Sequence, residues 1–183
     1  MARNPTSLSR RSWLAGVLLG SSGLAQAQSA APAESVAARE AKAPALPEVG
    51  SVLRVPNLSL LNGQKFDPAT SPTKITVLYW WASTCPFCAQ QSPEMQKLWS
   101  QLQGKGLQLL ALSVDKKPED ATSYLAKKGY TFPAAWVSPE VHRQLPKPRG
   151  LPITIVLDRQ GRVLQAEKGQ LFPEDVAQLS QWL

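Results

Sequence analysis

Short apolar runs alternate with amphipathic segments along most of this chain, starting near residue 75. Residues 75–82 and 107–114 are apolar, aromatic and β-branched, which predicts two buried strands. The first run is followed by apolar residues at helical intervals up to Leu102. After the second run, Pro118 is expected to begin a helix that Gly129 ends. This order predicts a β-α-β unit.

The C-terminal part of the chain predicts a second pair of strands and a last helix. Residues 152–157 form an apolar run, and a turn at 158–161 leads to an antiparallel partner strand over 162–167. Pro173 is expected to begin the final helix. Its apolar residues are expected to face inward: Val176, Leu179, Trp182 and Leu183. A β-α-β unit, a hairpin and a helix together predict an α/β fold, with a central mixed β-sheet flanked by helices.

An added β-hairpin is predicted before the first long apolar run. Residues 57–61 and 64–66 flank Asn62-Gly63. This dipeptide favours the two-residue turns in which both central residues have positive φ.

The N-terminus has the features of an export signal. Three arginines precede a short apolar core at 13–20, and Ala25-Gln26-Ala27 fits a cleavage site. The core is shorter than the roughly 20 residues of a membrane span. Arg10-Arg11 also resembles a twin-arginine signal, and the sequence leaves both export routes open. We expect residues 1–27 to direct the protein to the periplasm, with membrane anchoring only where cleavage fails.

A linker and one domain are expected to follow the signal. Residues 28–48 are rich in Ala, Pro, Ser and Glu and lack the apolar residues of a core, which predicts a flexible linker before a domain at 49–183. The net charge of +7 includes three arginines of the signal, which contains no acidic residue. The other basic residues are scattered, so we expect no nucleic-acid partner. We also expect a monomer.

The candidate chemistry lies in Cys85-Pro86-Phe87-Cys88, which contains the only two cysteines of the chain. The pair follows a predicted strand and begins a predicted helix. Unpaired backbone N–H groups and the helix dipole stabilise an anionic sulfur there. Because the thiolate is the reactive form of cysteine, we predict a redox pair with Cys85 as the nucleophile and Cys88 as the resolving thiol.

Other roles for the two cysteines fit less well. A structural disulfide at this spacing closes too small a loop to constrain the unfolded chain. A zinc site needs two more ligands, and the chain has a single histidine, His142. Cys85, Cys88 and His142 together could bind Cu(I), so a periplasmic copper chaperone stays as the alternative. The Pro-x-x-x-Thr-x-x-Cys arrangement usual in peroxidases is absent. We expect no resident metal or cofactor.

From Val49 to Leu183 the chain resembles the exported thioredoxin-fold thiol-disulfide oxidoreductases of the TlpA, ResA and CcmG type. The resemblance rests on five landmarks in the family's order: Trp81 to Cys88, Pro93, Val114-Asp115, Gly150 to Thr154, and Asp158 to Arg162. It implies a thioredoxin fold and enzymatic dithiol-disulfide exchange through Cys85 and Cys88.

The resemblance also implies a substrate groove around a cis-proline, Pro152, which packs opposite the redox pair in this fold. An X-Pro bond adopts the cis form at about 0.5–1 kcal/mol, far less than other peptide bonds. The backbone of Leu151 would then be free to pair with a substrate strand. The expected groove residues are Thr84, Pro86, Phe87, Leu151 and Pro152.

Three positions depart from the family's pattern. Thr84 stands where many relatives have tryptophan, and Gln91 where they often have glutamate. Tyr79 stands where thioredoxin buries an aspartate beneath the second cysteine. Loss of a proton from Cys88 must therefore depend on water, another side chain or the departing substrate thiolate.

The residues between the cysteines favour a reductase over a thiol oxidase or isomerase. Pro86 and Phe87 bring no charge that would over-stabilise the Cys85 thiolate, as strong oxidants do. The resemblance implies a membrane dithiol electron donor of the DsbD/CcdA type. It also implies exported protein disulfides as substrates, such as apocytochrome c or copper-site assembly factors.

Overall fold

The computed structural model describes residues 35–70 and 73–183, which lie in one compact unit. The predicted export signal lies outside the described residues. No helix in the described ranges has the length and apolar character needed to cross a membrane.

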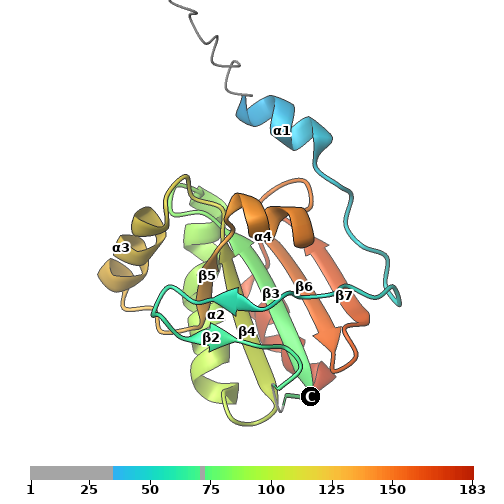
Figure 1. Ribbon diagram of the computed structural model, residues 1–183. Coiled ribbons are helices and arrows are strands. Elements are labelled where there is room, and N and C mark those ends of the chain that lie inside the picture. The colour runs from blue at the N-terminus through green and yellow to red at the C-terminus, as the bar shows by residue number, and fades with distance from the viewer. Residues whose placement is uncertain (1–34, 71–72) are drawn as a thin grey trace, which may run out of the picture. The chain divides into compact units, whose positions relative to one another are not determined.

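A five-stranded mixed sheet forms the centre of the fold (Figure 1). Its order is β5-β4-β3-β6-β7, in which β3, β4 and β5 run parallel while β6 and β7 complete it as antiparallel neighbours. The strands are β3 (Ile75–Trp81), β4 (Leu107–Ser113), β5 (Ala134–Trp136), β6 (Ile153–Asp158) and β7 (Val163–Lys168). The predicted mixed α/β sheet is confirmed, and the short strand β5 is an addition to it.

Each helix after β3 begins at a proline. The helices are α2 (Pro86–Leu102), α3 (Pro118–Lys128), α4 (Pro139–Gln144) and α5 (Pro173–Gln178), followed by a 3-10 turn over Leu179–Trp182. Proline suits the first helical position because its fixed φ fits the helix and its missing N–H would have no partner there. Gly129 ends α3 in the left-handed conformation, with φ 68°, as the sequence predicts.

The core lies on both faces of the sheet. In β3, Val77, Tyr79 and Trp81 join the cluster that contains residues of α2 and α5. Leu78 and Trp80 point to the other face, where they join residues of the N-terminal hairpin. Burial on both faces explains why β3 reads as a continuous apolar run rather than an alternating one.

The N-terminal hairpin is present, but its turn differs from the prediction. Strand β1 (Leu58–Ser59) pairs antiparallel with β2 (Lys65–Phe66). The Gly63 N–H donates to the Leu60 carbonyl, and the Leu60 N–H donates to the Gln64 carbonyl. The loop therefore has three residues, with Gly63 at φ 85° as the bulge after the turn, rather than two central residues Asn62-Gly63.

Residues around this hairpin also cover both edges of the sheet. The Leu61 N–H donates to the Ala134 carbonyl at the β5 edge, with an N···O distance of 2.7 Å. At the β7 edge, the Val163 N–H donates to the Ser51 carbonyl and the Leu53 N–H donates to the Gly161 carbonyl, both at 2.8 Å.

The predicted linker contains an ordered helix. Residues 36–42 form α1 (Val36–Lys42), with Ser35 as its N-cap, and Leu46 packs against the hydrophobic core. This helix belongs to the same compact unit as the residues after Val49. The difference arises because α1 is held by polar contacts with a distant loop, which the apolar content of 28–48 does not reveal.

One inward-facing residue of the last helix is predicted wrongly. Val176 and Leu179 are buried, but Trp182 is 37% exposed. The chain changes from α5 to a 3-10 turn at Leu179, which changes the rotation per residue. The Trp182 Nε1 then donates to Gln165 Oε1 at 3.0 Å.

Candidate redox site

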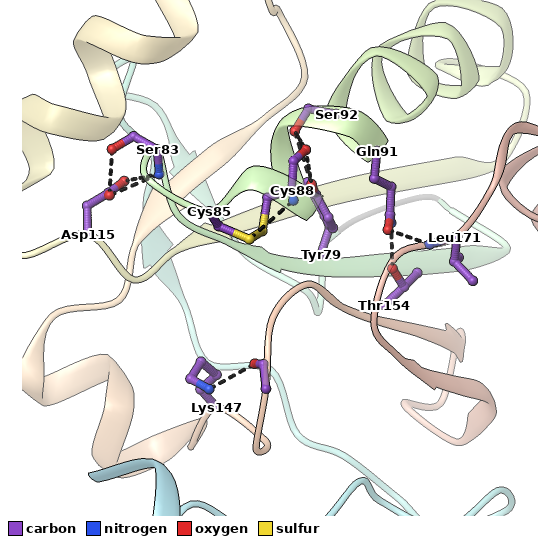
Figure 2. The surroundings of a disulfide bond; sticks show 11 residues. Tyr79, Ser83, Cys85, Cys88, Gln91, Ser92, Asp115, Lys147, Thr154 and Leu171 are labelled. Atoms are coloured by element: carbon purple, nitrogen blue, oxygen red, sulfur yellow. Dashed lines mark hydrogen bonds between the residues drawn. A yellow bond between two sulfur atoms is a disulfide. The ribbon is translucent and has the colours of Figure 1, made fainter. Parts of the chain in front are cut away.

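The cysteine pair lies where β3 leads into α2. Cys85 is the N-cap of α2, and its Sγ accepts a hydrogen bond from the Cys88 N–H at 3.2 Å (Figure 2). The two cysteines form a disulfide, with their Cα atoms 5.2 Å apart. The sulfur of Cys85 therefore lies against the positive end of a helix, where an anion is stabilised.

The two cysteines differ in exposure. Cys88 is 1% exposed, whereas Cys85 is partly accessible. The neighbours Thr84, Pro86 and Phe87 are exposed, and Phe87 has 56% of its surface open to solvent. Of the two cysteines, only Cys85 is accessible to a sulfur atom of another molecule. It can attack that sulfur or be attacked by it.

Tyr79 lies beneath the second cysteine. Its hydroxyl lies 3.1 Å from the Cys88 carbonyl and 3.0 Å from Ser92 Oγ, and the Ser92 hydroxyl also donates to the Cys88 carbonyl. Burial raises the pKa of the Tyr79 hydroxyl well above its ordinary value, against the opposing effect of the Ser92 hydrogen bond. Tyr79 is therefore a neutral donor that fixes this turn of α2, and it is no proton acceptor for Cys88.

Gln91 lies on α2, and its side chain is fully buried against strand β6. Its Nε2 donates to Thr154 Oγ1 at 2.9 Å, and its Oε1 accepts the Leu171 N–H at 2.9 Å. The side chain thus uses its donor and its acceptor on two different segments, both visible in Figure 2. It holds α2 to the strand that follows Pro152.

The peptide bond between Leu151 and Pro152 is cis, as predicted. Trp80 pairs with Ile153 in the antiparallel ladder, so Pro152 lies beside the C-terminal end of β3, from which the Cys85 loop leaves. Pro152 is buried, Leu151 is half-buried, and the Pro152 carbonyl accepts the Gly169 N–H at 2.9 Å.

Asp115 anchors the loop before Cys85, a role that the sequence did not reveal. Its buried carboxylate accepts hydrogen bonds from the Ser83 N–H at 3.0 Å, the Ser83 hydroxyl at 2.8 Å and the Ser113 hydroxyl at 2.8 Å. The available signal was an aspartate directly after a buried strand. Charged acceptors make strong hydrogen bonds, so this cluster fixes the backbone two residues before the nucleophile.

The sequence also does not indicate the structural role of Lys147, which it shows only as one of many scattered lysines. Its side chain is buried, and its Nζ donates to the Pro148 and Gly150 carbonyls in the loop before Pro152. Glu40 of α1 supplies an opposite charge, with Oε1 2.6 Å from Nζ.

His142 does not join the cysteine pair. It is exposed on α4, and the described part of the chain contains no group of three or more His, Cys, Asp or Glu placed to hold a metal ion. The ligand set predicted for copper is therefore not assembled in this structure.

Residues 53–169 match the AhpC/TSA family. The chain belongs to this family. The AhpC/TSA chain is 26% identical to the thiol-disulfide oxidoreductase ResA of Bacillus thuringiensis subsp. konkukian over 119 residues, which cover 63% of this chain and 67% of the relative. It is 26% identical to ResA of Geobacillus thermodenitrificans over 121 residues, or 66% and 70% of the two chains.

Solved structures agree with this assignment. A putative thiol:disulfide interchange protein DsbE from Chlorobium tepidum is 29% identical, with a TM-score of 0.61 over 74% of this chain and 94% of the other. StoA from Bacillus subtilis matches at 18% identity with a TM-score of 0.59, over 74% and 98%, and shows the thioredoxin fold. This AhpC/TSA-family protein is a thiol-disulfide oxidoreductase of the ResA and DsbE type, with Cys85 and Cys88 as its cysteine pair.

Proposed function

We propose that this protein is a periplasmic reductase of disulfides in specific exported proteins. The difference in exposure between Cys85 and Cys88 is the observation that supports this most, because it gives the two thiols different parts in the exchange. The groove residues Thr84, Phe87 and Leu151 would meet the substrate.

The exchange takes place in two steps. The Cys85 thiolate attacks one sulfur of the substrate disulfide, forming a mixed disulfide and releasing the other substrate sulfur as a thiolate. Cys88 then loses its proton and attacks Cys85 Sγ, which forms the Cys85–Cys88 disulfide and releases the second substrate thiolate. The substrate gains two electrons and, from the thiol and solvent, two protons.

The site supports both steps. The start of α2 and the Cys88 N–H stabilise the Cys85 thiolate. Because Tyr79 stays protonated, we assign the proton of Cys88 to the departing substrate thiolate or to water. The cluster of Tyr79 and Ser92 keeps the Cys88 turn in place while its sulfur moves between partners.

The proposed direction rests on the dipeptide between the cysteines. Pro86 and Phe87 carry no charge, so the thiolate lacks the extra stabilisation that makes a strong oxidant. A reductase in an oxidising compartment needs a supply of electrons, for which we propose a membrane dithiol carrier of the DsbD/CcdA type. The proposed location rests on the export features of residues 1–27.

Two substrate classes fit this proposal. Apocytochrome c must have its Cys-x-x-Cys-His thiols reduced before haem attachment, and copper-site assembly factors also work through reduced thiols. Both would present a disulfide in an extended segment to the groove beside Pro152.

The equilibrium reduction potential of the Cys85–Cys88 pair against glutathione tests the direction. We expect a value well below the roughly −120 mV of strong oxidants. A potential near that value would overturn the reductase proposal and favour an oxidase.

A Cys88→Ala variant tests the substrate. Without the resolving thiol, the mixed disulfide at Cys85 should persist and can be isolated from cells with its partner attached. Cys85→Ala is the matched control and should trap nothing. If Cys88→Ala recovers no exported protein either, the proposed substrate class is wrong.

A further inference from the structure

The loop that leads to Pro152 is built around a buried ammonium group. Lys147 is 8% exposed, and its Nζ donates to the Pro148 carbonyl at 2.8 Å and the Gly150 carbonyl at 3.0 Å. A lysine ammonium has three N–H donors. The third faces Glu40 Oε1 at 2.6 Å, so Glu40 completes the set and neutralises the buried charge.

Glu40 also contacts the backbone of the same loop. Its Oε2 accepts the Gly150 N–H at 2.9 Å, one residue before Leu151. One carboxylate therefore bridges the loop's buried cation and the backbone that enters the cis peptide bond. Gly150 has φ 97°, a left-handed conformation that favours glycine at this point of the loop.

Arg149 attaches the same loop to the end of α1. Its Nε donates to the Glu40 carbonyl at 3.1 Å, and its guanidinium donates to the Ala41 carbonyl at 2.8 Å. These carbonyls belong to the last turn of α1, where helix carbonyls lack partners and a cation is favoured. The backbone N–H of Arg149 also donates a hydrogen bond to the Pro44 carbonyl at 2.9 Å. Helix α1 and the loop at 147–150 thus hold each other at several points.

The loop ends at the residue expected to meet the substrate backbone. Within the described ranges, the N–H and carbonyl of Leu151 have no hydrogen-bond partner. Leu151 is half-buried, and its two unpaired backbone groups are available to an extended substrate segment. The position of these two groups is set by the residues just before them, Lys147 to Gly150.

We propose that Glu40 is a positioning residue for substrate capture, which holds the Leu151 backbone in place through Lys147 and Gly150. The inference rests on the proposed function, in which a protein disulfide binds beside Pro152. It gives α1, which lies in the segment that the sequence predicts as a linker, a part in recognition. Glu40 does not touch the sulfur atoms, so the chemistry of the cysteine pair should not depend on it.

A pair of substrates separates this role from a merely structural one. Insulin presents its disulfides in a polypeptide that can pair with Leu151, whereas hydroxyethyl disulfide has no backbone to pair. For Glu40→Gln in the full chain, we expect the KM for insulin to rise by about threefold to tenfold, with kcat nearly unchanged. The rate with hydroxyethyl disulfide and the reduction potential of Cys85–Cys88 should match the wild-type values.

Glu48→Gln is the matched control, because it removes the same charge from an exposed residue nearby. It should leave the KM for insulin unchanged. Lys147→Met is a second variant and should raise the KM in the same direction. Combined with Glu40→Gln, it should add little, since both changes release the same contact. Thermal unfolding of each variant checks that it is folded.

An unchanged KM for insulin in Glu40→Gln would overturn the proposal. So would equal losses with both substrates, or a shifted potential, since either would place the effect on the cysteine pair or on the whole fold. If the wild-type Cys85–Cys88 pair proves to be a strong oxidant, the reductase proposal is wrong, but the proposed role of Glu40 is not affected. The same comparison then uses reduced insulin chains and a small thiol as substrates.

Discussion

The side-chain amide nitrogen of Gln91 lies 2.9 Å from Thr154 Oγ1, and this hydrogen bond joins the redox helix to the strand that follows Pro152. The same side chain accepts the Leu171 N–H. The hydrogen bonds of Gln91 therefore connect the helix that carries the cysteine pair to the strand that follows the cis-proline.

Replacing Gln91 by leucine should weaken the fold. Gln91→Leu leaves the Leu171 N–H and the Thr154 hydroxyl buried without this partner, so we expect the free energy of unfolding to fall by about 3 kcal/mol. Urea denaturation measures the change. Gln90→Leu alters the exposed neighbour on the same helix and should change the value by less than about 0.5 kcal/mol. Equal effects of the two variants would contradict the bridging role.

Removing the anchor of the Cys85 loop should have a comparable effect. Asp115→Ala takes away the acceptor of the Ser83 N–H and of two serine hydroxyls, and we expect a loss of about 2–3 kcal/mol in unfolding free energy. Because the loop carries the nucleophile, kcat/KM should also fall, by about tenfold. Asp120→Ala, on the exposed side of α3, serves as the control for both measurements. Wild-type activity in Asp115→Ala would show that the loop keeps its position without the anchor.

The buried phenol of Tyr79 should make stability depend on alkaline pH. Burial raises its pKa in the folded state, whereas the unfolded residue ionises near pH 10. The stabilising contribution is therefore complete below about pH 10 and falls as the pH rises above it, because only the unfolded chain releases the proton there. In Tyr79→Phe the alkaline loss of stability should be smaller, as followed by unfolding temperature between pH 8 and 11. Tyr124→Phe, at a less buried tyrosine, should change it less.

The contribution of Glu40 to stability should depend on pH in the acidic range. Its partial burial raises the pKa, but the hydrogen bonds from Lys147 and Gly150 and the charges of Lys147 and Arg149 outweigh this and lower it overall. The stabilisation is present above the unfolded value near 4.5 and is lost as the pH falls through the lower folded value. The difference in unfolding temperature between wild type and Glu40→Gln should therefore shrink as the pH is lowered from 7 to 3. A difference that stays constant would show that the charge of Glu40 contributes nothing.

Local patterns were sufficient for the long elements and for the redox pair. The continuous apolar run of β3, the prolines at the helix starts and Gly129 each act within a few residues, so the sequence predicts them directly. Cys85 and Cys88 could be placed for the same reason. The cis bond at Pro152 followed from the resemblance to relatives rather than from any local signal.

The features that were missed depend on distant partners or on short segments. Helix α1 has an alanine-rich sequence typical of a linker, and its contacts with Lys147 and Arg149 lie more than 100 residues away. Strand β5 has three residues and α4 has six, too few for a periodic pattern. The α-helical period predicts an inward Trp182, but the chain tightens into a 3-10 turn at Leu179 and so turns this side chain outward.

Residues 51–53 pair with the start of β7, and Leu61 pairs with β5. These contacts bear on how readily copies of the protein aggregate. Exposed strand edges offer unpaired N–H and carbonyl groups on which a second chain can add, which leads to aggregation. Here the segment just upstream of β3 occupies part of both outer strands, so each copy shields its own sheet. Such self-shielding leaves fewer unpaired backbone groups at the margins of the sheet for a second copy of this oxidoreductase to pair with.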